Sequence, residues 1–117
     1  MINKRRHKRF SISGSADLTY RVQEKNQIIH TLVSDISLSG IGLYLDAPLE
    51  ENLDVSLTIS FIAGDGSIKT ATIDGGIVYS RKIEDVYFTG VQFHEEINPN
   101  HQPSLYKHMQ NILIRDG

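Results

Sequence analysis

The 117-residue sequence contains no cysteine and no long apolar run. The lack of cysteine excludes disulfide bonds, thiol catalysis and cysteine-ligated metal sites, and it fits the reducing cytosol. No unbroken apolar run exceeds four residues, whereas a membrane-spanning helix needs about 20. The basic N-terminus is followed by Phe10-Ser11-Ile12-Ser13 rather than by an apolar signal core. We therefore expect a cytoplasmic protein that does not insert into a membrane.

Patterns typical of an enzyme or a metal site are also missing. The five histidines are scattered without zinc-like spacing, so we expect no metal site. No serine lies in a G-x-S-x-G turn, and no nucleophile, base and orienting group occur together. The sequence therefore predicts a protein that is not an enzyme. What is present is 39% hydrophobic residues in a 13.2 kDa chain, which is enough for one domain with its own core.

Positive charge is concentrated at one end of the chain. The net charge is −2, but the first ten residues hold five basic side chains and no acidic one. The rest of the chain holds seven basic residues and all fourteen acidic ones, a net charge of −7. Such asymmetry indicates an anionic partner that the N-terminal segment contacts. The acidic body argues against a nucleic-acid-binding barrel of the OB type, which needs a basic groove lined with aromatic residues.

Most of the chain alternates apolar and polar residues, which is typical of half-buried strands. Gly64-Asp65-Gly66 is a hairpin turn signal, and Gly75-Gly76 indicates a bulge or bend within a strand. The strands are expected at residues 15–22, 28–36, 41–45, 53–61, 68–81 and 86–93. The spacing of Leu105, Met109, Ile112 and Leu113 predicts a helix over 103–115. We therefore expect a mainly β protein, a six-stranded antiparallel β-barrel without free edges and with a C-terminal α-helix.

Two local patterns carry chemistry. Arg5 and Arg9 form an R-x-x-x-R pair, whose planar guanidinium groups match phosphate oxygens and the guanine edge. Asp35, Ser37 and Gly40 form a D-x-S-x-x-G pattern at a strand end, where an acid and a hydroxyl on one strand face could hold one ligand. Each pattern alone has a plainer interpretation: a solvated basic tail, and a turn whose side chains bond their own backbone.

Together, in this order and on a six-stranded pattern, these two motifs resemble the PilZ domain family, whose members are bacterial receptors for cyclic di-GMP. The resemblance covers most of the chain and includes Ile41-Gly42-Leu43-Tyr44-Leu45 and the late segment Thr89-Gly90-Val91-Gln92-Phe93. It implies a barrel of six antiparallel strands with a C-terminal helix. That fold agrees with the one that the alternation predicts independently.

The resemblance also implies a role for each motif residue. Arg5 and Arg9 would clamp the ligand by stacking on guanine and pairing with phosphate, and Arg6 matches a further arginine of that segment. Asp35 would hold a guanine edge, Ser37 would reach a phosphate oxygen, and Gly40 would leave room for the ligand. His7 and Lys8 depart from the family pattern.

The expected organisation is a flexible ligand-clamping loop at 1–12 and a barrel domain at 13–117, in a single-domain member of the family. We expect a conformational change on nucleotide binding, a downstream protein partner in motility, exopolysaccharide or biofilm control, and no DNA, RNA or cofactor other than the ligand. The chain would be a monomer or a homodimer. The alternatives are a protein–protein adaptor of the same fold with a silent nucleotide site, and an OB-like single-stranded nucleic-acid binder.

Overall fold

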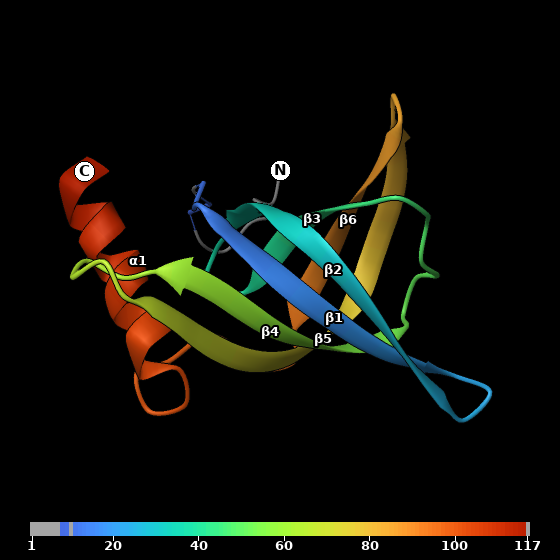
Figure 1. The fold of residues 1–117 in the computed structure, drawn as a ribbon, viewed down its shortest axis with the longest axis horizontal. Coiled ribbons are helices and arrows are strands. Elements are labelled where there is room, and N and C mark those ends of the chain that lie inside the picture. The colour runs from blue at the N-terminus through green and yellow to red at the C-terminus, as the bar shows by residue number, and fades with distance from the viewer. Residues whose placement is uncertain (1–7, 10, 117) are drawn as a thin grey trace, which may run out of the picture.

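The computed structural model of the chain describes residues 8–9 and 11–116, with side chains as far as Ile112. Six strands are followed by one helix, in the order that the alternation predicts (Figure 1). The elements are β1 (Gly14–Val22), β2 (Lys25–Ile36), β3 (Gly40–Leu45), β4 (Asp54–Ile62), β5 (Ile68–Ile83), β6 (Val86–Phe93) and α1 (Pro103–Asp116).

The strands form a closed antiparallel barrel in the order β1-β2-β3-β6-β5-β4, and β4 pairs with β1 to complete it. This confirms the predicted fold class. The β1–β2 and β5–β6 hairpins extend beyond the body of the barrel and diverge at one side of it, whereas α1 lies at the opposite side (Figure 1). Closure pairs the strands at both edges of the sheet, so their apolar side chains can be enclosed without an open edge.

The core follows from the period-two pattern. In β4 the side chains of Val55, Leu57, Ile59 and Phe61 are each at most 4% exposed. The intervening polar residues face outward, as the burial pattern of the strand shows. Successive side chains of a strand point to opposite faces, so one apolar row is enough to line the interior of a barrel. The alternation in this segment is therefore confirmed.

The second strand begins earlier than the sequence predicts. Polar residues 24–27 indicate a turn, but β2 begins at Lys25 and pairs with Val22 of β1. The turn consists of Gln23 and Glu24 alone, both with positive φ, at 51° and 66°. A two-residue turn with two left-handed residues matches the twist of a hairpin. The polar residues after it form an exposed strand, which composition alone does not distinguish from a loop.

The irregularity of β5 also differs from the prediction. Gly75 and Gly76 pair regularly with both neighbouring strands, and the register against β6 shifts between Ile77 and Tyr79 instead. Gly75 is needed for a different reason, because a Cβ atom there would lie 2.5 Å from the backbone oxygen of Gln92. The glycine allows β6 to approach closely, and the bulge follows it.

The helix packs against the barrel through the predicted stripe. Leu105, Met109 and Ile112 are at most 6% exposed; the side chain of Leu113 lies outside the described part. Pro103 occupies the first helical position, where a missing N–H costs nothing. The described residues include no helix that is both long and apolar enough to span a bilayer.

One buried glutamine joins the start of the helix to the barrel. The Gln102 amide donates to the backbone oxygen of Thr72 in β5 at 3.4 Å and accepts from the backbone N–H of Asn98 at 3.2 Å. Its side chain belongs to the few buried polar groups of the described chain. The entry of the chain into α1 is thereby held against β5.

Candidate functional site

An ion pair joins the segment before β1 to the end of β2. The Arg9 Nε donates to Asp35 Oδ1 at 2.6 Å, and Arg9 Nη2 lies 2.5 Å from the same oxygen. The two side chains are 18% and 24% exposed. Such charge-assisted contacts are shorter and stronger than neutral hydrogen bonds, and partial burial reduces their screening by water. The structure thus brings one residue of each predicted motif together.

A β-bulge directs the Asp35 side chain outward. The register of β2 against β3 shifts between Val33 and Asp35, so Ser34 is the extra residue. Val33 lies opposite Leu43, which is buried in the core, and Asp35 lies opposite Gly42. Since successive strand residues alternate between faces, an uninterrupted β2 would direct both Val33 and Asp35 inward. The bulge therefore places the carboxylate on the outer face of the barrel.

Two glycines of β3 lie beside the ion pair. A Cβ atom at Gly40 would lie 3.7 Å from Arg9 Nη1 and 2.7 Å from the backbone oxygen of Val91. A Cβ atom at Gly42 would lie 3.0 Å from Asp35 Oδ2. The guanidinium and the carboxylate therefore lie close to the bare backbone of β3. At Gly40 the missing side chain is required by the close approach of the β6 backbone, whereas the distance to Arg9 is an ordinary contact. Room for a ligand at Gly40 stays a prediction.

Ser37 occupies a different environment. Ser37 is 1% exposed, and its hydroxyl oxygen accepts hydrogen bonds from the backbone N–H groups of Ser39 and Gly40, both at 3.2 Å. Strand β2 ends at Ile36, so the same-face relation of a strand does not extend from Asp35 to Ser37. The hydroxyl stabilises the turn between β2 and β3, as the plainer interpretation of the motif states. Its contact with phosphate stays a prediction.

The remaining arginines of the basic segment, Arg5 and Arg6, lie outside the described residues, as does His7, so their roles stay predictions. Lys8 is exposed. Ile12 belongs to the hydrophobic core, with 8% of its surface exposed. The chain therefore joins the core two residues before β1 begins. The division into a loop at 1–12 and a barrel at 13–117 stays a prediction.

Sequence reasoning missed Ser34 as part of this site. Its hydroxyl donates to Asp35 Oδ2 at 3.1 Å, so both oxygens of the carboxylate have protein partners. No local signal distinguishes this serine from the others, because the bulge depends on how β2 pairs with β3. Gly42 could have been found, since alternation along β3 places it on the same face as Gly40.

A second polar region lies near the start of the helix. His94 Nε2 is 3.4 Å from Asp54 Oδ1, and His101 Nδ1 is 3.9 Å from Glu95 Oε2. These side chains are largely exposed, at 54% or more. No three His, Asp or Glu side chains of the described residues are grouped as a metal ion requires. These exposed pairs are therefore weaker candidates for a ligand or metal site than the Arg9–Asp35 pair.

Comparison with solved structures identifies similar folds. The inhibitor of motility MotI/DgrA of Bacillus subtilis superposes with a TM-score of 0.71 at 16% identity, covering 96% of this chain and 53% of that one. The MrkH–c-di-GMP complex of K. pneumonia gives 0.69 at 20% identity, covering 98% and 55%. The PilZ domain of YcgR from Escherichia coli with c-di-GMP gives 0.54 at 18% identity, covering 97% and 91%. At these identities the similarity establishes the fold.

A comparison with family models gives a match over nearly the whole chain. The PilZ domain model matches residues 3–113. No curated protein sequence matches at a significant level. The chain spans about half the length of the MotI/DgrA and MrkH chains. The family match includes both sequence motifs and all six strands.

Proposed function

The chain belongs to the PilZ domain family, and on that premise we propose that it is a non-enzymatic receptor for cyclic di-GMP. The observation that carries this proposal is the contact between Arg9 and Asp35 on the outer face of the barrel. These residues come from two motifs separated by 26 positions. Two of the similar structures, MrkH and the YcgR domain, contain c-di-GMP.

The chemistry of the pair suits this ligand. Cyclic di-GMP is a dianion with two guanines, so it needs cationic donors for phosphate and an acceptor for the guanine edge. An ionised carboxylate only accepts hydrogen bonds, and the N1–H and N2–H₂ groups of guanine are adjacent donors. Guanidinium supplies planar donors that match phosphate oxygens. Arg9 and Asp35 supply one group of each kind, side by side.

We infer an exchange of partners at the Asp35 carboxylate. Oδ1 accepts from the charged Arg9, whereas Oδ2 accepts only from the neutral Ser34 hydroxyl. A guanine edge therefore displaces Ser34 more easily than Arg9, because the serine hydroxyl carries no charge, whereas Arg9 forms an ion pair with the carboxylate. Arg9 then remains on Oδ1 and directs its other N–H groups to phosphate. Arg5 and Arg6 add further guanidinium groups to the same dianion.

The expected affinity follows from a few strong contacts. A hydrogen bond to a charged group contributes about 1.5–3 kcal/mol. Four or five such bonds, reduced by the cost of ordering the clamping segment at 1–12, give micromolar binding or better. Ligand binding then changes the surface that the protein offers to a downstream partner, and this change of surface is the signal.

Calorimetric titration with cyclic di-GMP tests the site. Arg9→Ala and Asp35→Ala should each weaken binding at least about tenfold, because each removes a charged contact. Arg21→Ala and Asp17→Ala are matched controls, since both change an exposed charge on β1; they should bind as the unmodified protein does. Unchanged affinity in both site variants would remove Arg9 and Asp35 from the site.

One observation favours a second candidate, a protein–protein adaptor with a silent nucleotide site. Both Asp35 oxygens already have protein partners, Arg9 and Ser34. In this alternative the pair is a structural clasp between the N-terminal segment and the barrel. The adaptor would bind its partner equally well with and without cyclic di-GMP, and calorimetry would detect no heat of nucleotide binding.

A further inference from the structure

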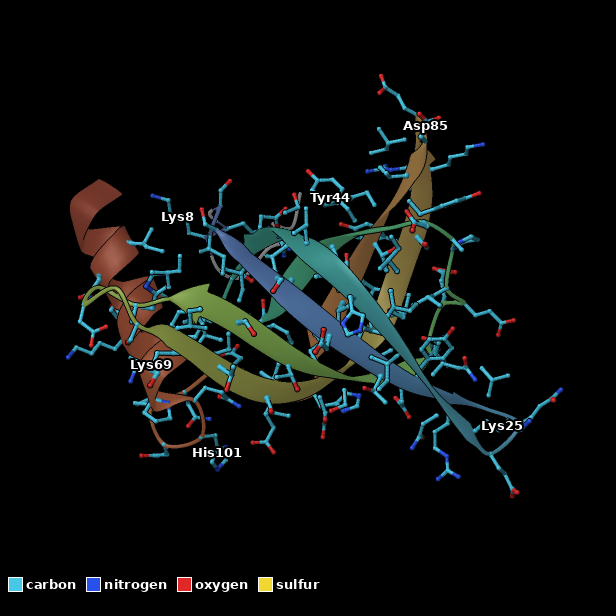
Figure 2. All side chains as sticks on the ribbon, viewed as in Figure 1. Lys8, Lys25, Tyr44, Lys69, Asp85 and His101 are labelled. Atoms are coloured by element: carbon cyan, nitrogen blue, oxygen red, sulfur yellow. The ribbon has the colours of Figure 1, made fainter. Side chains whose placement is uncertain are left out.

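Three aromatic rings lie in contact on the outer face of the barrel. Tyr44 of β3 is directly opposite Phe88 of β6, and their ring centroids are 5.8 Å apart. Tyr79 of β5 follows, with its centroid 5.9 Å from that of Phe88. We name these residues the aromatic surface. Tyr44 is 44% exposed, and Figure 2 shows it on the outside of β3. Phe88 and Tyr79 are partly buried, and contiguous apolar surface of this kind is common at binding sites.

Bare backbone lies beneath these rings. Gly42 and Gly90 are direct partners across the β3–β6 ladder. A Cβ atom at Gly90 would lie 2.5 Å from the Tyr79 ring, and one at Gly42 would lie 2.8 Å from the Phe88 ring. No side chain could occupy either position without moving a ring. The glycines thus let Tyr79 and Phe88 lie against the sheet, which holds the rings in place before any ligand arrives.

The aromatic surface adjoins the ion pair directly. The position of a Gly42 Cβ atom is within 3.0 Å of both the Phe88 ring and Asp35 Oδ2. The Phe88 ring and the Asp35 carboxylate are therefore neighbours on the outer face of the barrel. A planar base whose edge bonds to Asp35 would therefore lie beside this ring.

A second arginine borders the far side of the aromatic surface. The Arg81 guanidinium lies 5.9 Å above the centroid of the Tyr79 ring, and Arg81 is opposite Phe88 in the β5–β6 ladder. It is exposed. Among the described residues, Arg81 has no carboxylate within ion-pair distance. The ring face attracts the cation and keeps it at this edge.

We propose that the aromatic surface and Arg81 are the second part of the nucleotide site, in which a purine base stacks on Phe88 and Arg81 binds a phosphate of the same ligand. This inference rests on the proposed function. Arg9 and Arg81 then lie at opposite ends of the aromatic surface. That arrangement matches a ligand with two phosphates and two flat bases, since stacking holds the bases while the cations hold the charges.

Substitutions of Phe88 and Arg81 test the proposal. Phe88→Leu keeps an apolar side chain but removes the ring, and it should weaken binding of cyclic di-GMP at least about fivefold. Arg81→Gln should weaken binding about tenfold through the lost charge. Lys82→Gln is the matched control, because it removes the same charge from the next residue of β5 and should leave affinity unchanged.

Two readouts separate a binding role from a structural one. Thermal unfolding of each variant reports whether the barrel is intact, and calorimetry is carried out well below the unfolding temperature. Ring protons of Phe88 should shift in NMR spectra when cyclic di-GMP is added to the unmodified protein. That shift, together with weaker binding by a Phe88→Leu variant that unfolds at an unchanged temperature, supports stacking.

The outcomes distinguish this inference from the function on which it rests. If the unmodified protein binds cyclic di-GMP and Arg9→Ala weakens binding, but Phe88→Leu and Arg81→Gln do not, the aromatic surface is no part of the site and the receptor function stands. If Arg81→Gln and Lys82→Gln lose affinity equally, the effect is one of overall charge, and the assigned contact of Arg81 with phosphate is wrong. No binding by the unmodified protein overturns both proposals.

Discussion

Asp35 faces Gly42 across the β2–β3 ladder because Ser34 is an extra residue in β2. One inserted residue thereby decides whether a carboxylate points to the core or to the surface. On the surface it meets Arg9 and adjoins the aromatic ring of Phe88. The proposed site thus depends on an irregularity of the sheet, as is common where a strand must present a functional side chain.

Deleting Ser34 should destabilise the barrel far more than truncating its side chain. The deletion restores regular pairing and directs Asp35 inward without Arg9, which we expect to lower the free energy of unfolding by at least about 3 kcal/mol. Ser34→Ala keeps the bulge and loses one hydrogen bond, a change of about 1 kcal/mol. Urea unfolding measures both. Equal midpoints for the two variants would show that the bulge does not orient Asp35.

Gly75→Ala should destabilise the barrel although Gly75 is not at the bulge. The new Cβ atom would lie 2.5 Å from the backbone oxygen of Gln92 and 2.8 Å from a methyl group of Val91. Backbone cannot move aside as a flexible side chain can, so we expect a loss of about 1–3 kcal/mol. Gly64→Ala is the control, because nothing lies within 4 Å of its Cβ position. A similar unfolding midpoint for the two variants would contradict the close approach of β6.

Ser37→Ala should affect stability even without ligand. It leaves the N–H groups of Ser39 and Gly40 without the hydroxyl acceptor in a buried turn, at a cost of about 1–3 kcal/mol. Thermal unfolding in the absence of nucleotide measures this, with the exposed Ser11→Ala as control. An unchanged unfolding temperature would mean that the hydroxyl does not stabilise the turn. Its predicted contact with phosphate would then be its remaining role.

Gln102→Ala should loosen the docking of α1. It removes the hydrogen bond to Thr72 of β5 and the acceptor for the Asn98 N–H, with an expected loss of about 1–2 kcal/mol. Amide hydrogen exchange should quicken in α1 and change little in β3. Asn100→Ala alters an exposed side chain of the same turn and should leave exchange as it is. Unaltered protection of α1 in Gln102→Ala would contradict the anchoring role.

Ser67→Ala should raise the pKa of Asp65. Hydrogen bonds from the Ser67 hydroxyl, at 2.6 Å, and from its backbone N–H, at 2.9 Å, lower the pKa of that carboxyl from its ordinary value of 3.8. A lowered folded-state pKa stabilises the fold at pH values above the ordinary pKa, and this contribution is lost as the pH falls through the lowered value. NMR titration should show a higher pKa in the variant; an identical titration curve would exclude the hydroxyl as the main cause.

The alternation of side chains made the architecture predictable. Its period of two depends only on local backbone geometry, so the apolar row of β4 and its partners could be recognised without knowing what they pack against. The same holds for the helical stripe of Leu105, Met109 and Ile112. The residues at which strands begin and end were less predictable. Polar residues after Glu24 form a strand because a tight turn precedes them, and composition does not show that turn.

The sequence by itself determined the strand order along the chain, the helix and the two motifs, because each of these is local or periodic. Pairing between strands distant in the sequence decided the rest. The extra residue at Ser34, the contact of Arg9 with Asp35 and the position of Phe88 beside Gly42 all depend on register. Register is set by the closure of the whole barrel, so the face on which these residues meet is a property of the tertiary structure.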